Sequence, residues 1–211
     1  MLKKKNLFLF PILICFILFL WLDSDLLKYA SVLLCFVNAL LTGKESFEKK
    51  DTALLQAAMF VTVIADSFLL FTNYYFLGVC LFCMVQLIYI VRHSRYSKVH
   101  TNIFNLSCAV FMSAAVVWIM SSGLVEKAIA IAGCFYAFLT LFSVYTAFRA
   151  AQQKRYPKKM IALINVGLWL LMLCDINVAL YNTISHYHIT GLIIWLFYLP
   201  SQLLLSMSAR K

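Results

Sequence analysis

The chain has 211 residues, of which 64% are hydrophobic and only 12% are charged, and its formal net charge is +10. A soluble domain is about 45–50% apolar and about 25% charged, so this composition excludes a soluble globular protein. The Lys and Arg residues gather in short segments between apolar runs, as the positive-inside rule describes, and the positive charge therefore does not indicate a nucleic-acid partner.

Eight apolar runs follow one another along the chain. A bilayer core of roughly 30 Å requires about 20 apolar residues per helix. The predicted spans cover residues 6–22, 26–42, 52–71, 74–91, 103–121, 125–149, 160–181 and 189–207. The first run has the charge and length of a signal peptide, but no small-residue cleavage site follows it, so we expect it to be retained. The sequence thus predicts an all-α, eight-helix transmembrane bundle that forms a single domain over residues 1–211.

The distribution of Lys and Arg gives the orientation of these spans. With eight crossings, sixteen of the eighteen basic residues fall on one side and only Lys28 and Lys127 on the other. The bias predicts that both termini are cytoplasmic. We interpret the segment with Arg92, His93, Arg95, Lys98 and His100 as a basic cytoplasmic loop that serves topology and contacts anionic head groups.

An internal similarity appears when the sequence is shifted by 109 positions. Residues 49–73 then lie over residues 158–182, and the acids Asp66 and Asp175 coincide, as do Asn73 and Asn182. The flanking Lys pairs also match. This spacing predicts a parallel four-plus-four repeat with halves of about 1–100 and 101–211, an architecture that occurs in membrane transporters.

The two matched acids are the main candidate site. An ionised Asp at the centre of a membrane helix costs about 2.5–3.5 kcal/mol, and such residues usually mark function. Each Asp lies seven residues before its Asn, on the same helix face and about 10 Å below the outer end. Meeting across a central cavity, Asp66 and Asp175 would form a catalytic acid/base pair. The alternative is a pair of protonated acids that only stabilise helix contacts.

Two stripes of small, aromatic and amide residues lie on the helices that follow the acids. They either line the same cavity or form packing seams, because small residues let helices approach and buried amides bind between helices. Pro200 is expected to kink the last helix. The stripes are Gly78, Phe82, Gln86 and Tyr89, and Gly191, Trp195, Tyr198 and Gln202.

Neither cysteine nor histidine indicates a metal or a cofactor. All seven Cys residues lie in apolar runs, and the pair Cys80 and Cys83 lacks the second pair that a metal site would need. His186 and His188 fit a solvated outer loop. We therefore expect no metal and no cofactor.

These residues resemble the YhhN-like lysoplasmalogenase family. The Gly-Asp motif of that family stands here as Ala65-Asp66, and its F-x-x-G motif as residues 75–78. Gln86 takes the place of the family His, with Tyr89 three residues later. The Ser-Asp motif stands as Cys174-Asp175. It is followed by Tyr198, Gln202 and the small-residue segment 206–209.

The resemblance implies an eight-helix enzyme that hydrolyses the vinyl ether bond of lysoplasmalogens, with Asp66 and Asp175 as catalytic residues. Its partners would be the bilayer, expected to be the cell membrane, and a lysophospholipid or other amphiphilic lipid. A proton- or cation-coupled small-molecule transporter and a non-catalytic lipid-binding protein remain alternatives. The side chains expected to bind substrate are those of Gln86, Tyr89, Tyr198, Gln202, Asn73 and Asn182.

Overall fold

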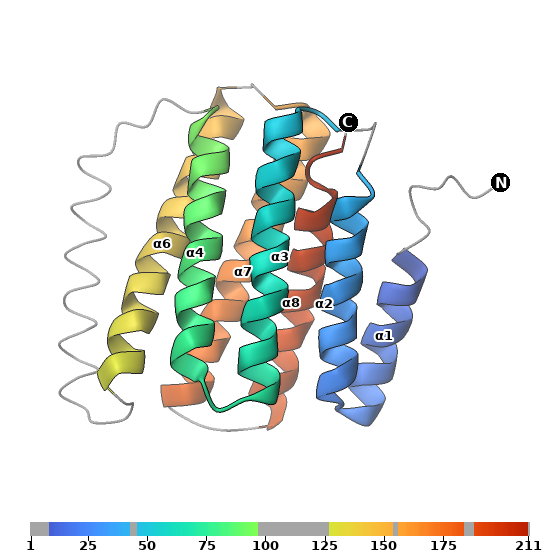
Figure 1. Ribbon diagram of the computed structural model, residues 1–211, viewed down its shortest axis with the longest axis vertical. Helices are drawn as coiled ribbons and strands as arrows, with labels where there is room; N and C mark the ends of the chain where they lie inside the picture. The colour runs from blue at the N-terminus through green and yellow to red at the C-terminus, as the bar shows by residue number, and fades with distance from the viewer. Residues whose placement is uncertain (1–8, 43–45, 97–126, 154–155, 184–187, 211) are drawn as a thin grey trace.

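The computed structural model describes residues 9–42, 46–96, 127–153, 156–183 and 188–210, and within these ranges the chain forms seven α-helices (Figure 1). They are α1 (Leu9–Leu22), α2 (Asp25–Leu40), α3 (Lys49–Phe71), α4 (Tyr75–Ser94), α6 (Lys127–Gln152), α7 (Lys158–Thr183) and α8 (His188–Met207). In lipid every backbone polar group must be satisfied internally, which is why apolar runs of this length fold as helices.

Five of the described helices are long and apolar enough to cross a membrane, namely α3, α4, α6, α7 and α8. The helices α1 and α2 are shorter, with 14 and 16 residues. The chain is therefore an all-α integral membrane protein. The fifth predicted span, residues 103–121, lies outside the described residues, and the count of eight helices stays a prediction.

Six of the described helices form a closed ring in the order α2, α3, α4, α6, α7 and α8, with α8 packing back against α2. The helix α1 packs on α2 at the edge, and α3 also contacts α8 across the ring. In Figure 1, α4 and α6 run in the same direction, and α7 and α8 lie behind α3 and α2. This order decides which helices can contribute side chains to a shared interior.

The bundle carries apolar side chains outside and many of its polar side chains inside. Phe135, Val166 and Trp169 are each at least half exposed, as expected of surface that faces lipid. The fully or almost fully buried polar side chains include Thr62, Asp66, Gln86, Thr140, Ser143 and Gln202. Burying a polar group inside a membrane protein costs free energy unless the group is hydrogen-bonded. The buried polar side chains therefore indicate a candidate site in the interior of the bundle.

Close helix contact on both sides of the ring depends on glycine. A Cβ added at Gly78 in α4 would come within 2.5 Å of the Leu69 side chain of α3, and one at Gly167 in α7 within 2.9 Å of Leu205 in α8. Small residues permit such approach between membrane helices. The 109-residue shift relates α3 to α7 and α4 to α8, and α3 packs against α4 as α7 packs against α8. The internal repeat nevertheless stays a prediction.

Candidate active site

Asp66 lies inside the ring and is held by a tyrosine from another helix. Its side chain projects from α3, is only 4% exposed, and accepts a 2.7 Å hydrogen bond from the Tyr198 hydroxyl of α8. A hydrogen bond to a charged group is worth about 1.5–3 kcal/mol. Asp66 and Tyr198, two predicted site residues from different halves of the chain, are 132 positions apart and in direct contact.

Asp175 has a similar environment on the other side of the ring. Its carboxylate accepts a 2.8 Å hydrogen bond from the Tyr136 hydroxyl of α6, and the Gln86 side-chain amide of α4 donates to the same hydroxyl at 3.4 Å. Unlike Asp66, Asp175 is only partly buried. The second acid is therefore the centre of a polar cluster that joins three helices, with Gln86 as its link to α4.

An aromatic ring lies between the two acid–tyrosine pairs. The Phe82 ring stands edge-on to both tyrosines, with centroid distances of 6.0 Å to Tyr136 and 6.5 Å to Tyr198. Cys174, which directly precedes Asp175 on α7, is also buried in the bundle. The two acids thus face one interior layer of the bundle, and each is positioned by a phenol. A shared cavity between them stays a prediction.

The remaining predicted site residues fall into two groups. Tyr89 and Gln202 are buried within the ring, where the Tyr89 hydroxyl contacts the Met59 sulfur at 3.8 Å. Asn73 follows the end of α3 and is exposed. Asn182 is exposed near the end of α7, and its amide donates to the Val178 carbonyl at 2.8 Å. A substrate-binding role for all four stays a prediction.

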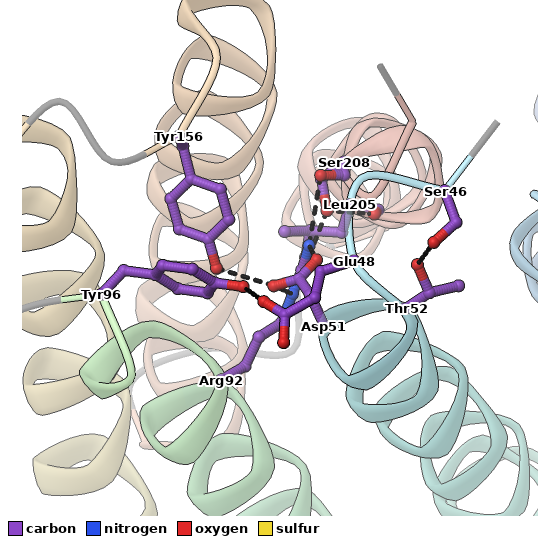
Figure 2. Close-up of polar contacts among 9 residues, drawn as sticks. All are labelled: Ser46, Glu48, Asp51, Thr52, Arg92, Tyr96, Tyr156, Leu205 and Ser208. Atoms are coloured by element: carbon purple, nitrogen blue, oxygen red, sulfur yellow. Dashed lines mark hydrogen bonds and ion pairs between the residues drawn. The ribbon is translucent and has the colours of Figure 1, made fainter.

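A second polar cluster lies at the opposite end of the bundle (Figure 2), the end at which α3 begins and α4 ends. The Arg92 guanidinium donates two hydrogen bonds to the Asp51 carboxylate, at 3.0 and 2.8 Å, and both side chains are completely buried. Tyr156 donates to the same carboxylate at 2.7 Å, and Arg92 also donates to the Ser208 hydroxyl at 2.9 Å. This cluster ties together α3, α4, the start of α7 and the end of α8.

The cluster corrects the interpretation of Arg92 and His93 as residues of a basic loop. The helix α4 continues to Ser94, and both side chains are 0% exposed. The His93 ring stacks on Tyr89 with a centroid distance of 5.9 Å. Arg92 can be buried because its charge is paired with Asp51 on the neighbouring helix α3. The helix α4 therefore continues past Arg92 instead of ending before it.

A more exposed ion pair covers this cluster. Glu48 accepts hydrogen bonds from Tyr96 and from the Arg95 guanidinium, and the Tyr96 ring lies 4.3 Å from the Tyr156 ring. The hydrogen bond from Tyr96, with that from Arg95, lowers the pKa of Glu48 below its usual value. A shallow hollow of about 410 Å³ lies beside Arg95 and is lined by Lys50, Ala53 and Leu54, away from both acids.

The lowered pKa of Glu48 makes a prediction about pH. A carboxyl whose pKa is depressed on folding stabilises the folded state above its unfolded pKa of about 4.3, and this contribution disappears as the pH falls through the folded value. The Glu48→Gln variant should therefore lose less stability than the parent protein between about pH 5 and pH 3. Thermal unfolding in detergent across this range tests it, and identical pH profiles would contradict it.

The sequence reasoning missed Tyr136, Asp51 and Tyr156. Tyr136 has a signal in hindsight, since it forms one polar stripe on α6 with Thr140 and Ser143 at i+4 and i+7. Asp51 and Tyr156 carried no comparable pattern. Among the residues that the structure describes, no three His, Cys, Asp or Glu side chains are grouped in a way that could hold a metal ion.

These features define a polytopic α-helical membrane protein with two tyrosine-bound acids inside its bundle. The chain belongs to the YhhN family, because the model of that family matches residues 23–209. The match covers α2 to α8 and therefore both acids and both polar clusters. No curated protein sequence and no solved structure shows significant similarity to the chain.

Proposed function

We propose that this protein is a membrane-embedded hydrolase that cleaves the vinyl ether bond of lysoplasmalogens, with Asp66 and Asp175 as its acid/base pair. The observation that carries the proposal is the pair of intramembrane acids, each held by a tyrosine hydroxyl at about 2.7–2.8 Å and facing one interior layer. Membership of the YhhN family agrees with this assignment. We further propose that the protein lies in the cell membrane.

The chemistry requires two groups that exchange protons. One carboxylic acid protonates the β-carbon of the vinyl ether, which leaves an oxocarbenium ion at the α-carbon. Water adds to the α-carbon and gives a proton to a carboxylate, so the proton consumed in the first step is returned. The resulting hemiacetal collapses to a fatty aldehyde and the free glycerol hydroxyl. One water molecule is consumed for each bond cleaved.

Tyr136 and Tyr198 are positioning residues in this scheme. Each fixes one oxygen of its carboxyl group by a hydrogen bond. The Gln86 amide in turn orients the Tyr136 hydroxyl. Gln86, Tyr89 and Gln202 are the interior side chains available to contact the polar part of the substrate, whose alkenyl chain would enter from the surrounding lipid.

The test is release of a long-chain aldehyde from lysoplasmalogen by the purified protein in proteoliposomes. The matched control substrate is the acyl lysophospholipid with the same head group, which has no vinyl ether and should yield no aldehyde. Failure of the parent protein to release aldehyde would contradict the proposal. Substrate-dependent proton flux without product would instead favour the transporter alternative.

The tyrosines give a separate prediction. Tyr136→Phe and Tyr198→Phe should each lower kcat by about tenfold to a hundredfold, because losing a bond worth about 1.5–3 kcal/mol releases the carboxyl from its reactive position. The measurement is the rate of aldehyde release at saturating substrate. Tyr29→Phe is the control, since Tyr29 lies on α2, which carries neither acid and neither tyrosine of the two pairs, and its ring packs edge-on against Phe71. An unchanged kcat in both variants would refute the positioning role.

A further inference from the structure

Several polar side chains inside the bundle have no hydrogen-bond partner among the described residues. They include the side-chain oxygens of Gln86, Thr140 and Ser143 and both ring nitrogens of His93. Each of these four side chains is at most 3% exposed. A buried polar group without a partner costs about 1–3 kcal/mol. Such groups in a folded protein usually bind internal water, each molecule of which makes about two to four hydrogen bonds.

These groups lie along the contact between α4 and α6. On α6, Tyr136, Thr140 and Ser143 share one face at i, i+4 and i+7. On α4, Gln86 and His93 are also seven residues apart, which is about 10 Å along the helix axis. The two helices run in the same direction (Figure 1), and Gln86 contacts Tyr136. The same offset of 50 positions places Ser143 of α6 opposite His93 of α4.

The two ends of the line have different surroundings. At one end, Thr140 lies one helical turn from Tyr136, whose hydroxyl donates to the Asp175 carboxylate at 2.8 Å. At the other end, His93 is the last residue but one of α4, next to the Asp51–Arg92 cluster and the partly exposed Tyr96. The line therefore leads from the predicted cytoplasmic end of the bundle to the more accessible of the two acids.

We propose that Gln86, Thr140, Ser143 and His93 line a hydrated path between α4 and α6 that delivers water from the cytoplasmic end of the bundle to Asp175. The path rests on the proposed function, because vinyl ether hydrolysis consumes one water per turnover and the lipid around the bundle supplies none. Water bound along the path satisfies the four unpartnered side chains. It also reaches the carboxylate without passing the apolar surface by which a lipid would enter.

The experiment is X-ray hydroxyl-radical footprinting of the purified full-length protein in lipid nanodiscs. Radicals form from water at the site of irradiation, so a buried side chain is modified only where water is bound next to it. We expect His93 and Tyr136 to be modified in the parent protein, whereas Met160, which is 0% exposed on α7, stays unmodified. Absence of modification at both His93 and Tyr136 would overturn the proposal without the need for any variant.

Two variants test whether the hydration is continuous. Ser143→Ala and Thr140→Val should reduce Tyr136 modification several-fold and lower kcat several-fold with little change in KM. The control is Thr62→Val, because the buried Thr62 hydroxyl is already bound to the Ala58 carbonyl of its own helix at 2.9 Å. If the two variants change the modification of His93 and leave that of Tyr136 unchanged, the water is confined to a closed pocket. That result would overturn the delivery path. Circular dichroism verifies that each variant is folded.

The outcome separates this inference from the proposed function. Interior modification in a protein that releases no aldehyde would leave the hydrated path in place and reject the hydrolase. Aldehyde release by a protein whose His93 and Tyr136 stay unmodified would reject the path and keep the hydrolase.

Discussion

Replacing either intramembrane acid by its amide should reduce aldehyde release by about a hundredfold to ten-thousandfold, the usual contribution of a general acid or base. Asparagine keeps the size of aspartate and can still accept the hydrogen bond from Tyr198 or Tyr136. Asp66→Asn and Asp175→Asn therefore keep the hydrogen bond to the tyrosine and remove the capacity of the side chain to donate or accept a proton. The measurement is single-turnover aldehyde release in proteoliposomes, which isolates the chemical step from product release.

The double variant makes this test more informative. If the acids act as one unit, Asp66→Asn combined with Asp175→Asn should be about as slow as the slower single variant, since residues that act together are strongly non-additive. Thr62→Val, on the same helix as Asp66, controls for general disturbance of the interior. Aldehyde release by the double variant at the parental rate would reject catalysis by this pair.

Breaking the Asp51–Arg92 pair should cost about 3–5 kcal/mol of stability for either single replacement, because the remaining partner is left as an uncompensated buried charge. The pair has no exposed surface and shares Tyr156 and Ser208 as hydrogen-bonding neighbours. The variants are Asp51→Asn and Arg92→Met. Unfolding by SDS titration in mixed micelles, followed by circular dichroism, gives the free energies.

The combined variant distinguishes a charge effect from a packing effect. With both charges removed no ion remains buried alone, so Asp51→Asn with Arg92→Met should be clearly less destabilised than the sum of the single variants. Lys50→Gln is the control, since this neighbouring side chain is exposed and its loss should stay within about 0.5 kcal/mol. Additive free energies would contradict a coupled pair.

The positions of the described helices were predictable because lipid imposes one strong pattern. Apolar runs gave all seven to within a few residues, and they placed Asp66 and Asp175 in the C-terminal halves of α3 and α7. The ends were less predictable. The helix α3 begins three residues before its predicted start and α4 ends three residues after its predicted end. A charge normally ends an apolar run, and nothing in either segment alone shows that Asp51 and Arg92 neutralise each other.

The partners of the acids were less predictable than the acids themselves. Tyr198 was a candidate because it lies on the stripe of α8, yet its contact with Asp66 depends on α8 touching α3 across the ring. Tyr136 looked like one more aromatic residue in an apolar run. The order of helices around the ring determines such pairings, and periodicity within one helix contains no information about it.

The contacts between α2 and the end of α8 have a consequence for biosynthesis. The Asn38 amide donates to the Ser206 hydroxyl at 2.9 Å, across 168 positions of sequence, and Arg210 donates to the Asn38 carbonyl oxygens. Insertion proceeds from the N-terminal side, so α2 enters the bilayer before α8. Until α8 has left the translocon, the Asn38 amide lacks its hydrogen bond to Ser206. During that interval a membrane chaperone or quality-control protease would find this face of α2 unprotected.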